Sequence, residues 1–531
     1  MRRLLIVIAV GLALLATPAY AHGFGGRLES PLPVGLSLAA AAAAVALSFV
    51  IVSLFVRPSR LSSAYPRYDL LRLRWFRLTL ANRWTVRAAR ALSVSLLALV
   101  VSTGVFGDQN PARNFAPTFV WILWWIGLAF LTPFVGNLWA VLNPWKAIYE
   151  GLEALFMRGR GPLSVGLQYP RKAGVWPAVA LFLAFAWVEN VSPFAATPLQ
   201  ITRMALAYSL ITWTGMLVFG KQVWLHYGEA FNVFYGFLAR FAPTELRVTD
   251  RAVCDACPLD CREESECVNC SSCWERSVAV EEKSRRLAPS RRGPRGKGLL
   301  LLEPARQFNL RPFALSLARG ERVGWDRVVF VLLMLATVSF DGLSATPVWS
   351  AAAGKAGDLL SVTGSADALL VQTLGLAVLP GMFTLAYLGF AYLIGAFAGE
   401  GRSVGVAAKG FVYSLIPIAL AYHLSHFLGV LVFQGLRIIP LASDPYGFGW
   451  DLFGTAGYAV TGTFITTKVL WYFSVGAIVL GHIISVYLAH VAALRLFQGH
   501  RQALRSQYPM LLLMVGYTVS SLWILAQPIV K

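Results

Sequence analysis

Apolar residues in this chain fall into continuous blocks of about twenty, separated by polar, mostly basic segments. A helix needs about 20 apolar residues to cross the hydrocarbon core of a bilayer, whereas the strands of a membrane barrel alternate apolar and polar residues. The pattern therefore predicts an all-α fold, a polytopic transmembrane helical bundle with about ten spans. The expected spans are 33–56, 89–106, 117–141, 175–194, 200–219, 327–347, 367–398, 411–434, 469–494 and 509–529.

The first 21 residues form a separate element. A basic start, an apolar middle and a small-x-small ending at Ala19-Tyr20-Ala21 are typical of a secretory signal peptide cleaved before His22. An uncleaved first helix is the alternative, and in either case His22 begins outside the cytoplasm. The expected organisation is then a signal peptide at 1–21, a first membrane half at 22–219, a large cytoplasmic loop at 220–326 and a second membrane half at 327–531.

Composition and charge agree with a membrane protein. Charged residues make up 14% of the chain, against about 25% in soluble domains. The net charge of +20 at first suggests nucleic acid, but the segments threaded to the inside hold 36 Lys and Arg and those outside hold six. This asymmetry is the positive-inside rule, so we expect a multi-pass protein of the bacterial inner membrane and no nucleic-acid partner. The expected partners are the bilayer and, at the basic loops, anionic headgroups; protein partners are unknown.

Two basic stretches adjoin these spans. Residues 57–90 carry nine Arg against one acid, interleaved with Leu, Trp and Phe, which predicts an amphipathic helix on the anionic leaflet. Residues 283–297 carry seven Lys and Arg and no acid, which predicts a mobile basic linker near the membrane.

All six cysteines lie within twenty residues of the large loop. They are Cys254, Cys257, Cys261, Cys267, Cys270 and Cys273. Because disulfides are rare in the cytoplasm, such a cluster indicates metal. Two Cys-x-x-Cys pairs favour tetrahedral zinc, with an iron–sulfur cluster as second choice. Redox thiols, or disulfides if the orientation is reversed, stay open.

Ionisable residues inside predicted spans form a second candidate site. Such residues are costly in a bilayer, so each is a candidate for function by default. They are Glu189, Asp341, His423, His426 and His482. With a rise of about 1.5 Å per residue, all five lie about 18 to 22 Å above the inner boundary. We therefore expect one polar pocket between helices, suited to a divalent metal or a proton relay. The competing interpretation is that each His only bonds a nearby backbone carbonyl or Ser.

Three further residues are secondary candidates. His226 and Glu229 are three positions apart just after the fifth span, where an interfacial amphipathic helix explains them equally well. His490 lies about 12 Å closer to the cytoplasm than His482. The sequence has no Walker loop, H-E-x-x-H, G-x-S-x-G or dinucleotide motif, so ATP-driven transport within this chain is not expected.

Several stretches resemble a family of bacterial polytopic membrane proteins labelled fenitrothion hydrolase. The stretches are His22-Gly-Phe-Gly-Gly-Arg27, Asn114-Phe-Ala-Pro-Thr-Phe-Val-Trp121, Gly136-Asn-Leu-Trp139, Asn143-Pro-Trp145, Phe340-Asp-Gly-Leu343 and Gly516 to Pro528. The resemblance covers much of the membrane region and misses the cysteine loop. It implies cleavage of an organophosphate-type ester but supplies no catalytic residues.

Three functions are compatible with these features. We favour a transporter of a metal ion or small solute, because binding sites near the midplane between helices are the usual transporter architecture. The alternatives are a membrane-embedded metal-dependent hydrolase, as the resemblance implies, and a metal-binding membrane assembly factor or sensor. Whether the chain is an enzyme stays open.

Overall fold

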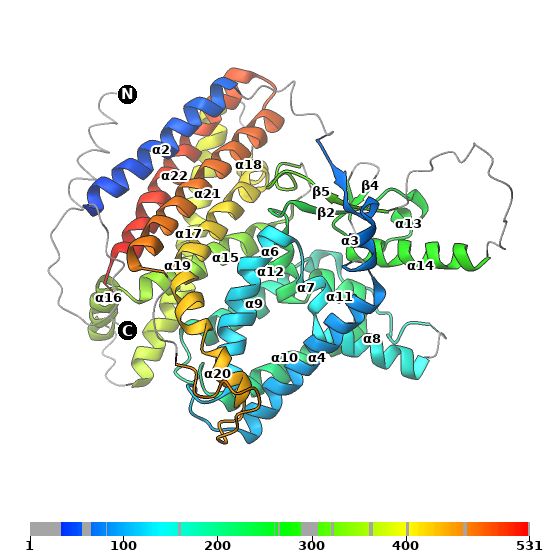
Figure 1. Ribbon diagram of the computed structural model, residues 1–531. Helices are drawn as coiled ribbons and strands as arrows, with labels where there is room; N and C mark the ends of the chain where they lie inside the picture. Colours follow the sequence, from blue (N-terminus) through cyan, green and yellow to red (C-terminus); the bar gives the residue numbers. More distant parts are fainter. Residues whose placement is uncertain are drawn as a thin grey trace.

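The computed structural model (Figure 1) describes most of the chain. The described ranges are 33–55, 65–80, 82–157, 161–259, 261–263, 266–287, 306–319, 323–359, 365–399, 403–459 and 465–528. The predicted signal peptide and residues 288–297 of the predicted basic linker lie outside them.

Ten helices in these ranges are long and apolar enough to cross a membrane, which confirms the all-α polytopic bundle. The protein is therefore a multi-pass membrane protein. The spans are α2 (Val34–Phe55), α4 (Arg83–Phe106), α5 with η3 and α6 (Phe115–Val135), η4 with α9 (Arg171–Asn190), α10 (Pro198–Phe219), α15 (Trp325–Ser344), α17 (Ser365–Ala398), α18 with η5 and α19 (Val404–Gly435), α21 (Thr467–Leu496) and α22 (His500–Ala526).

Shorter helices connect these spans or lie at their ends. They are α3 (Arg74–Leu78), α7 (Trp139–Leu142), α8 (Pro144–Met157), α11 (Lys221–Tyr227), α12 (Ala230–Ala239), α13 (Arg251–Asp255), α14 (Ser271–Leu287), α16 (Pro347–Leu359) and α20 (Ile438–Ser443), with the 3-10 turn η2 at Leu70–Arg72.

The third span differs locally from an α-helix. Thr118–Gly127 forms π-helical turns (η3), and Gly136, with φ of 119°, ends the span at Val135 rather than at the predicted residue 141. Only glycine adopts that backbone conformation without strain. A π-helix is rare and is frequent at functional sites, and this one carries Trp125 into the candidate site described below.

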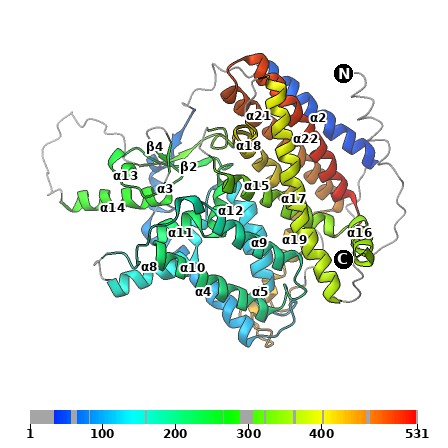
Figure 2. The ribbon, with the colours of Figure 1, turned by 180° about the vertical axis from the view of Figure 1, so that it is seen from behind.

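Helix packing does not follow the two halves of the sequence. Helix α2 lies alongside α21 and α22 (Figures 1 and 2), and Phe49 of α2 contacts the Tyr508 ring of α22 edge-on. The segment 22–219 is therefore not one packing unit. Helices α19 and α21 approach closely at Gly481, where a β-carbon would lie 2.4 Å from that of Ala421. Larger residues there would separate the two helices that carry three of the predicted histidines.

The predicted large loop folds into a small domain with a five-stranded antiparallel sheet. The strands, in sheet order, are β1 (Tyr68–Asp69), β5 (Arg306–Leu310), β2 (Thr244–Val248), β4 (Glu266–Val268) and β3 (Arg262–Glu263). The sheet lies at one end of the bundle, with α13 and α14 beside it (Figures 1 and 2). Sequence periodicity missed it because all five strands have only two to five residues.

The basic stretch 57–90 is not one amphipathic helix in its described part. Tyr68 and Asp69 form strand β1, and the chain then passes through η2 and α3 before α4 begins at Arg83. Phe76 is buried against Phe308 of β5, with ring centroids 5.2 Å apart. Pairing with the distant strand β5, which the local pattern does not encode, overrides the amphipathic periodicity.

Glu245 of β2 holds this domain together. Its buried carboxylate accepts hydrogen bonds from Arg311 (3.1 Å), Arg67 (2.9 Å) and the Tyr65 hydroxyl. Burial alone raises the pKa of Glu245, but the charges of Arg311, Arg67 and Arg319 outweigh it and hold the pKa below its usual range. The carboxylate thus joins the segment before α3 to strands separated from it by about 180 residues.

We expect Glu245→Gln to destabilise the small domain by about 3–5 kcal/mol, because it leaves buried Arg311 without its counter-charge. Since folding lowers the pKa of Glu245, its stabilising contribution is complete above the unfolded pKa of about 4.3 and is lost as the pH falls through the lowered folded value. The measurement is thermal unfolding of the solubilised protein between pH 3 and pH 7, with the added prediction that the variant has a weaker acid dependence.

The control is Glu153→Gln, whose carboxylate pairs with Lys221 at 2.5 Å in a partly exposed position. Such a pair contributes about 1 kcal/mol or less. Equal melting temperatures for Glu245→Gln and the control would contradict the assigned role of Glu245.

Candidate functional site

The centre of the intramembrane site is a hydrogen-bonded Asp–His pair between two spans. The Nε2 atom of His426 on α19 lies 2.7 Å from Oδ2 of Asp341 on α15. Both side chains are about one fifth exposed, and Asp341 lies three residues before the end of α15. A carboxylate and an imidazole at this distance share a proton, which lowers the cost of keeping either group inside a bilayer.

His423 lies one turn before His426 and faces an aromatic layer. Its ring is buried, 6.0 Å from the ring of Trp125 between centroids and 6.1 Å from that of Phe130. Trp125 in turn donates its indole N–H to Oε1 of Glu189 at 2.5 Å. Glu189 of α9 is therefore linked to His423 through Trp125.

His482 reaches the same region from α21. Its ring lies 6.0 Å from the Tyr517 ring of α22, and its Nδ1 bonds the Ile478 carbonyl at 2.8 Å. The hydroxyl of Tyr517 lies 2.6 Å from that of Ser339, two residues before Asp341. His482 thus bonds a backbone carbonyl of its own helix, which is the competing interpretation given above for single histidines.

Tyr422 links the two sides of this region. Its ring stacks on His426 at 5.9 Å and lies 6.3 Å from Tyr517. A β-carbon at position 342 would lie only 2.3 Å from the Tyr422 hydroxyl. Glycine at this position therefore leaves room for the hydroxyl next to Asp341. Among the described residues, the Tyr422 hydroxyl and the Nε2 atoms of His423 and His482 are buried without a hydrogen-bond partner. Buried polar atoms of this kind normally have a partner, so three in one region mark a site for water or a ligand.

The five predicted residues thus do not form one metal-binding cluster. Asp341 and His426 touch, whereas Glu189, His423 and His482 connect to them through Trp125, Tyr422 and Tyr517. In the part of the chain that the structure describes, the group of three or more His, Cys or carboxylate ligands at metal distance is made of cysteines. A shared depth does not by itself bring five side chains to metal-ligand distance, because depth fixes the level on each helix and not the direction of the side chain.

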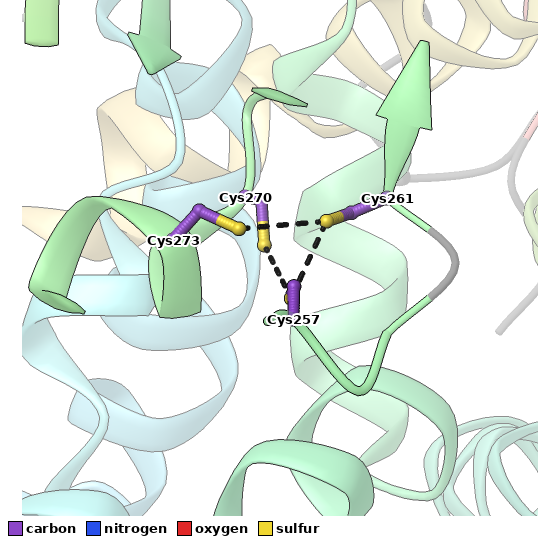
Figure 3. A group of neighbouring side chains, drawn as sticks. All are labelled: Cys257, Cys261, Cys270 and Cys273. Carbon is purple, nitrogen blue, oxygen red and sulfur yellow. Dashed lines mark hydrogen bonds between the residues drawn. The ribbon is translucent and has the colours of Figure 1, made fainter. Parts of the chain in front are cut away.

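The cysteine centre is compact. The Sγ atoms of Cys257, Cys261, Cys270 and Cys273 all lie within 4.8 Å of one another and point inward (Figure 3). Cys261 is 3.4 Å from Cys257 and 3.6 Å from Cys273, and Cys257 is 4.0 Å from Cys270. These four thiols can bind a metal ion. Cys267 and Cys254 adjoin the group, with Cys267 3.4 Å from Cys273.

Two ion pairs attach the cysteine centre to the bundle. Glu275, two residues after Cys273 on α14, binds Lys146 of α8 at 2.5 Å and Arg90 of α4 at 3.4 Å. Burial by itself raises the pKa of Glu275, but the charge and hydrogen bond of Lys146 outweigh it, and the pKa lies below its usual range. Helix α14 is therefore joined to α4 and α8 by charged side chains.

The secondary candidates have separate positions. His226 is on the last turn of α11, whereas Glu229 begins the next helix, so the two do not share an amphipathic helix. Glu229 is fully buried and accepts hydrogen bonds from Tyr208, Trp139 and Asn143, and burial raises its pKa. It also caps α12 through the N–H groups of the second and third residues after it. His490 bonds Gln507 at 2.9 Å, apart from the Asp341–His426 pair.

The residues that sequence reasoning missed are uncharged. Trp125, Tyr422, Tyr517 and Ser339 line the site. From the sequence, Trp125 is interpreted only as packing helices or facing lipid, and Tyr517 lies in one of the resembling stretches. The signal that could have found them is spacing, because Ser339 and Tyr422 lie two and one residues before ionisable positions. No family model, curated protein or solved structure matches this chain.

We expect the Asp341–His426 contact to appear as a coupling free energy. In a double-mutant cycle of Asp341→Asn and His426→Gln, the two losses of stability should differ from additivity by about 0.5–3 kcal/mol. The measurement is thermal unfolding of the four solubilised proteins. As a control, Asp341→Asn combined with His490→Gln should be additive within about 0.5 kcal/mol. Additivity in both cycles would rule out the contact.

Proposed function

We propose that the protein is a transporter of divalent metal ions in the bacterial inner membrane, with Asp341 and His426 as the transport site. The observation that carries the proposal is the Asp–His pair at 2.7 Å between two spans. Carboxylate and imidazole are the ligand types of divalent transition metals, and intramembrane ionisable residues mark ion pathways by default. The unpartnered Nε2 of His423, one turn away, is a further donor for the ion.

Proton exchange follows from the chemistry of the pair. A metal ion binds an ionised carboxylate and an unprotonated imidazole nitrogen, so its entry displaces the proton on Nε2 between Asp341 and His426. When both ring nitrogens carry a proton, the displaced proton leaves the pair. Release of the ion on the other side lets the pair take up a proton again. Outward metal movement would then accompany inward proton movement, and the inward-directed proton gradient of the bacterial inner membrane would drive metal export without ATP.

The prediction is a Zn²⁺ flux coupled to protons. Proteoliposomes of the full chain, loaded with a zinc dye or a pH dye, should take up Zn²⁺ at least ten times faster than protein-free vesicles and move protons in the opposite direction. Asp341→Asn and His426→Gln should each lose both fluxes more than ten-fold, because neither variant keeps the ligand pair.

The matched control is His490→Gln, which removes a buried histidine away from the pair and should stay within two-fold of wild type. Wild-type flux in both pair variants, or no flux above protein-free vesicles, would refute the transport site.

For the cysteine centre we propose zinc. Tetrahedral zinc with Zn–S bonds of about 2.3 Å holds its sulfurs about 3.8 Å apart. The three contacting Sγ pairs of the group, at 3.4 to 4.0 Å, bracket that value, and all four sulfurs lie within 4.8 Å of one another. In a [4Fe–4S] cluster each thiolate binds a different iron, which spaces the thiolates more widely. Because six cysteines and few large apolar residues form the core around the centre, the ion would also stabilise the small domain.

Orientation is part of the proposal. Threading from an outside start puts 17 Lys and Arg of segment 220–326 in the cytoplasm. We expect a membrane-impermeant maleimide, applied after metal chelation, to label the cysteines only in permeabilised cells. The control is a single cysteine introduced at exposed Phe448, in the segment between α20 and α21, which should be labelled in intact cells. The reverse result would invert the topology.

Hydrolysis of an organophosphate-type ester is the second candidate. It is supported by the resemblance, since Asp341, Tyr517, Trp139 and Asn143 of the resembling stretches take part in buried polar contacts. A metal-activated water would need more ligands than the pair offers, so transport is preferred. The ion pairs from Glu275 to Lys146 and Arg90 support a third role, in which metal at the cysteine centre regulates the bundle.

A further inference from the structure

The thiols of all six cysteines form one contact network. Besides the four in Figure 3, the Sγ atom of Cys267 lies 3.5 Å from that of Cys261 and 3.4 Å from that of Cys273. The thiol of Cys254 contacts that of Cys267. Cys267 and Cys273 are about 1% and 0% exposed. A structural zinc ion takes four ligands, so a single ion leaves Cys254 and Cys267 next to it as thiols outside the ligand set, with the Cys254 thiol donating to the Val248 carbonyl at 3.6 Å.

The contacts divide the six sulfurs into three pairs. Cys257 and Cys270 touch on one side of the network, and Cys254 and Cys267 touch on the other. Between them lie Cys261 and Cys273, 3.6 Å apart. Cys261 contacts Cys257 on one side and Cys267 on the other, at 3.4 and 3.5 Å. Cys273 contacts Cys267 and also belongs to the compact group with Cys257 and Cys270.

We infer that the six cysteines hold two divalent metal ions in one thiolate cluster, with Cys261 and Cys273 shared by both ions. The inference rests on the proposed assignment of zinc to this centre. One ion takes Cys257 and Cys270 as its own ligands, the other takes Cys254 and Cys267, and the shared pair completes both sets. Two four-coordinate ions need eight metal–sulfur bonds, and six sulfurs supply eight when two of them bridge.

The ligand set fixes the charge of the cluster and the number of protons released when it forms. Six thiols lose six protons to bind two divalent ions, and the cluster carries a net charge of −2. Basic side chains lie close to it. Arg276, three residues after Cys273, donates to the carbonyl of Ala256, beside Cys257. The guanidinium of Arg306 lies 5.1 Å above the ring of Trp274, which directly follows Cys273.

The second ion gives a structural role to Cys254. This residue lies on α13 and Cys267 on β4, so their ion fastens that helix to the sheet. Cys257 and Cys270 fasten the segment after α13 to the start of α14. Since Glu275 of α14 binds Lys146 and Arg90, the cluster as a whole fixes the domain against the bundle. Small domains without a large apolar core commonly depend on such metals.

The test is metal content and ¹¹³Cd NMR of the full-length solubilised protein. Wild type should hold two zinc ions per chain, and after exchange it should give two cadmium resonances split by each other through the shared sulfurs. Cys254→Ser should reduce the content to one ion per chain and leave one unsplit resonance. Cys261→Ser should remove the mutual splitting, since it deletes a bridge.

The outcomes separate the two proposals. One zinc ion per chain in wild type, unchanged in Cys254→Ser, would refute the two-metal cluster and leave the zinc assignment intact. Iron with acid-labile sulfide, or absence of zinc, would refute both. The wild-type measurements need no variant, so they decide the question even if Cys254→Ser fails to fold.

Discussion

The membrane region depends on one requirement. Each polar group inside the low-dielectric core of the bilayer must find its hydrogen-bond or charge partner within the protein. Helices satisfy their own backbone groups, so the ten spans form wherever apolar runs are long enough. Ionisable side chains have no such internal solution and must find partners on neighbouring helices. Asp341 and His426 do this directly, and Glu189 does it through the indole N–H of Trp125. The helices that carry these residues are thereby held in one arrangement.

The small domain solves the opposite problem, a shortage of apolar residues. Its core around the cysteines contains few large side chains, so charge and thiol chemistry replace hydrophobic burial. Glu245 gathers Arg67, Arg311 and Tyr65 in one buried network. Removal of one member of such a network is costly because the others stay buried. The domain is therefore held by a few strong polar contacts rather than by many weak apolar ones.

Ion pairs between the domain and the bundle tie the cysteine centre to two bundle helices, α4 and α8. Glu275 follows Cys273 by two residues and contacts Lys146 and Arg90 at the ends of α8 and α4. Any change in the cysteine centre that shifts α14 would move charges that the bundle helices share. The same end of the molecule also contains Glu229, whose buried carboxylate joins α12 to Trp139 and Asn143.

The sequence by itself determined the ten spans, because bilayer thickness sets a length of apolar helix that can be counted along the chain. It also located the ionisable residues by depth and the cysteines by spacing. Only the tertiary structure decided which of them touch. His426 meets Asp341 and His482 bonds its own helix, since side-chain direction depends on helix rotation and packing, which local periodicity does not encode. The sheet of β1 to β5 escaped prediction for a related reason: Tyr68 pairs with Leu310, and a pairing across 242 positions has no local signal.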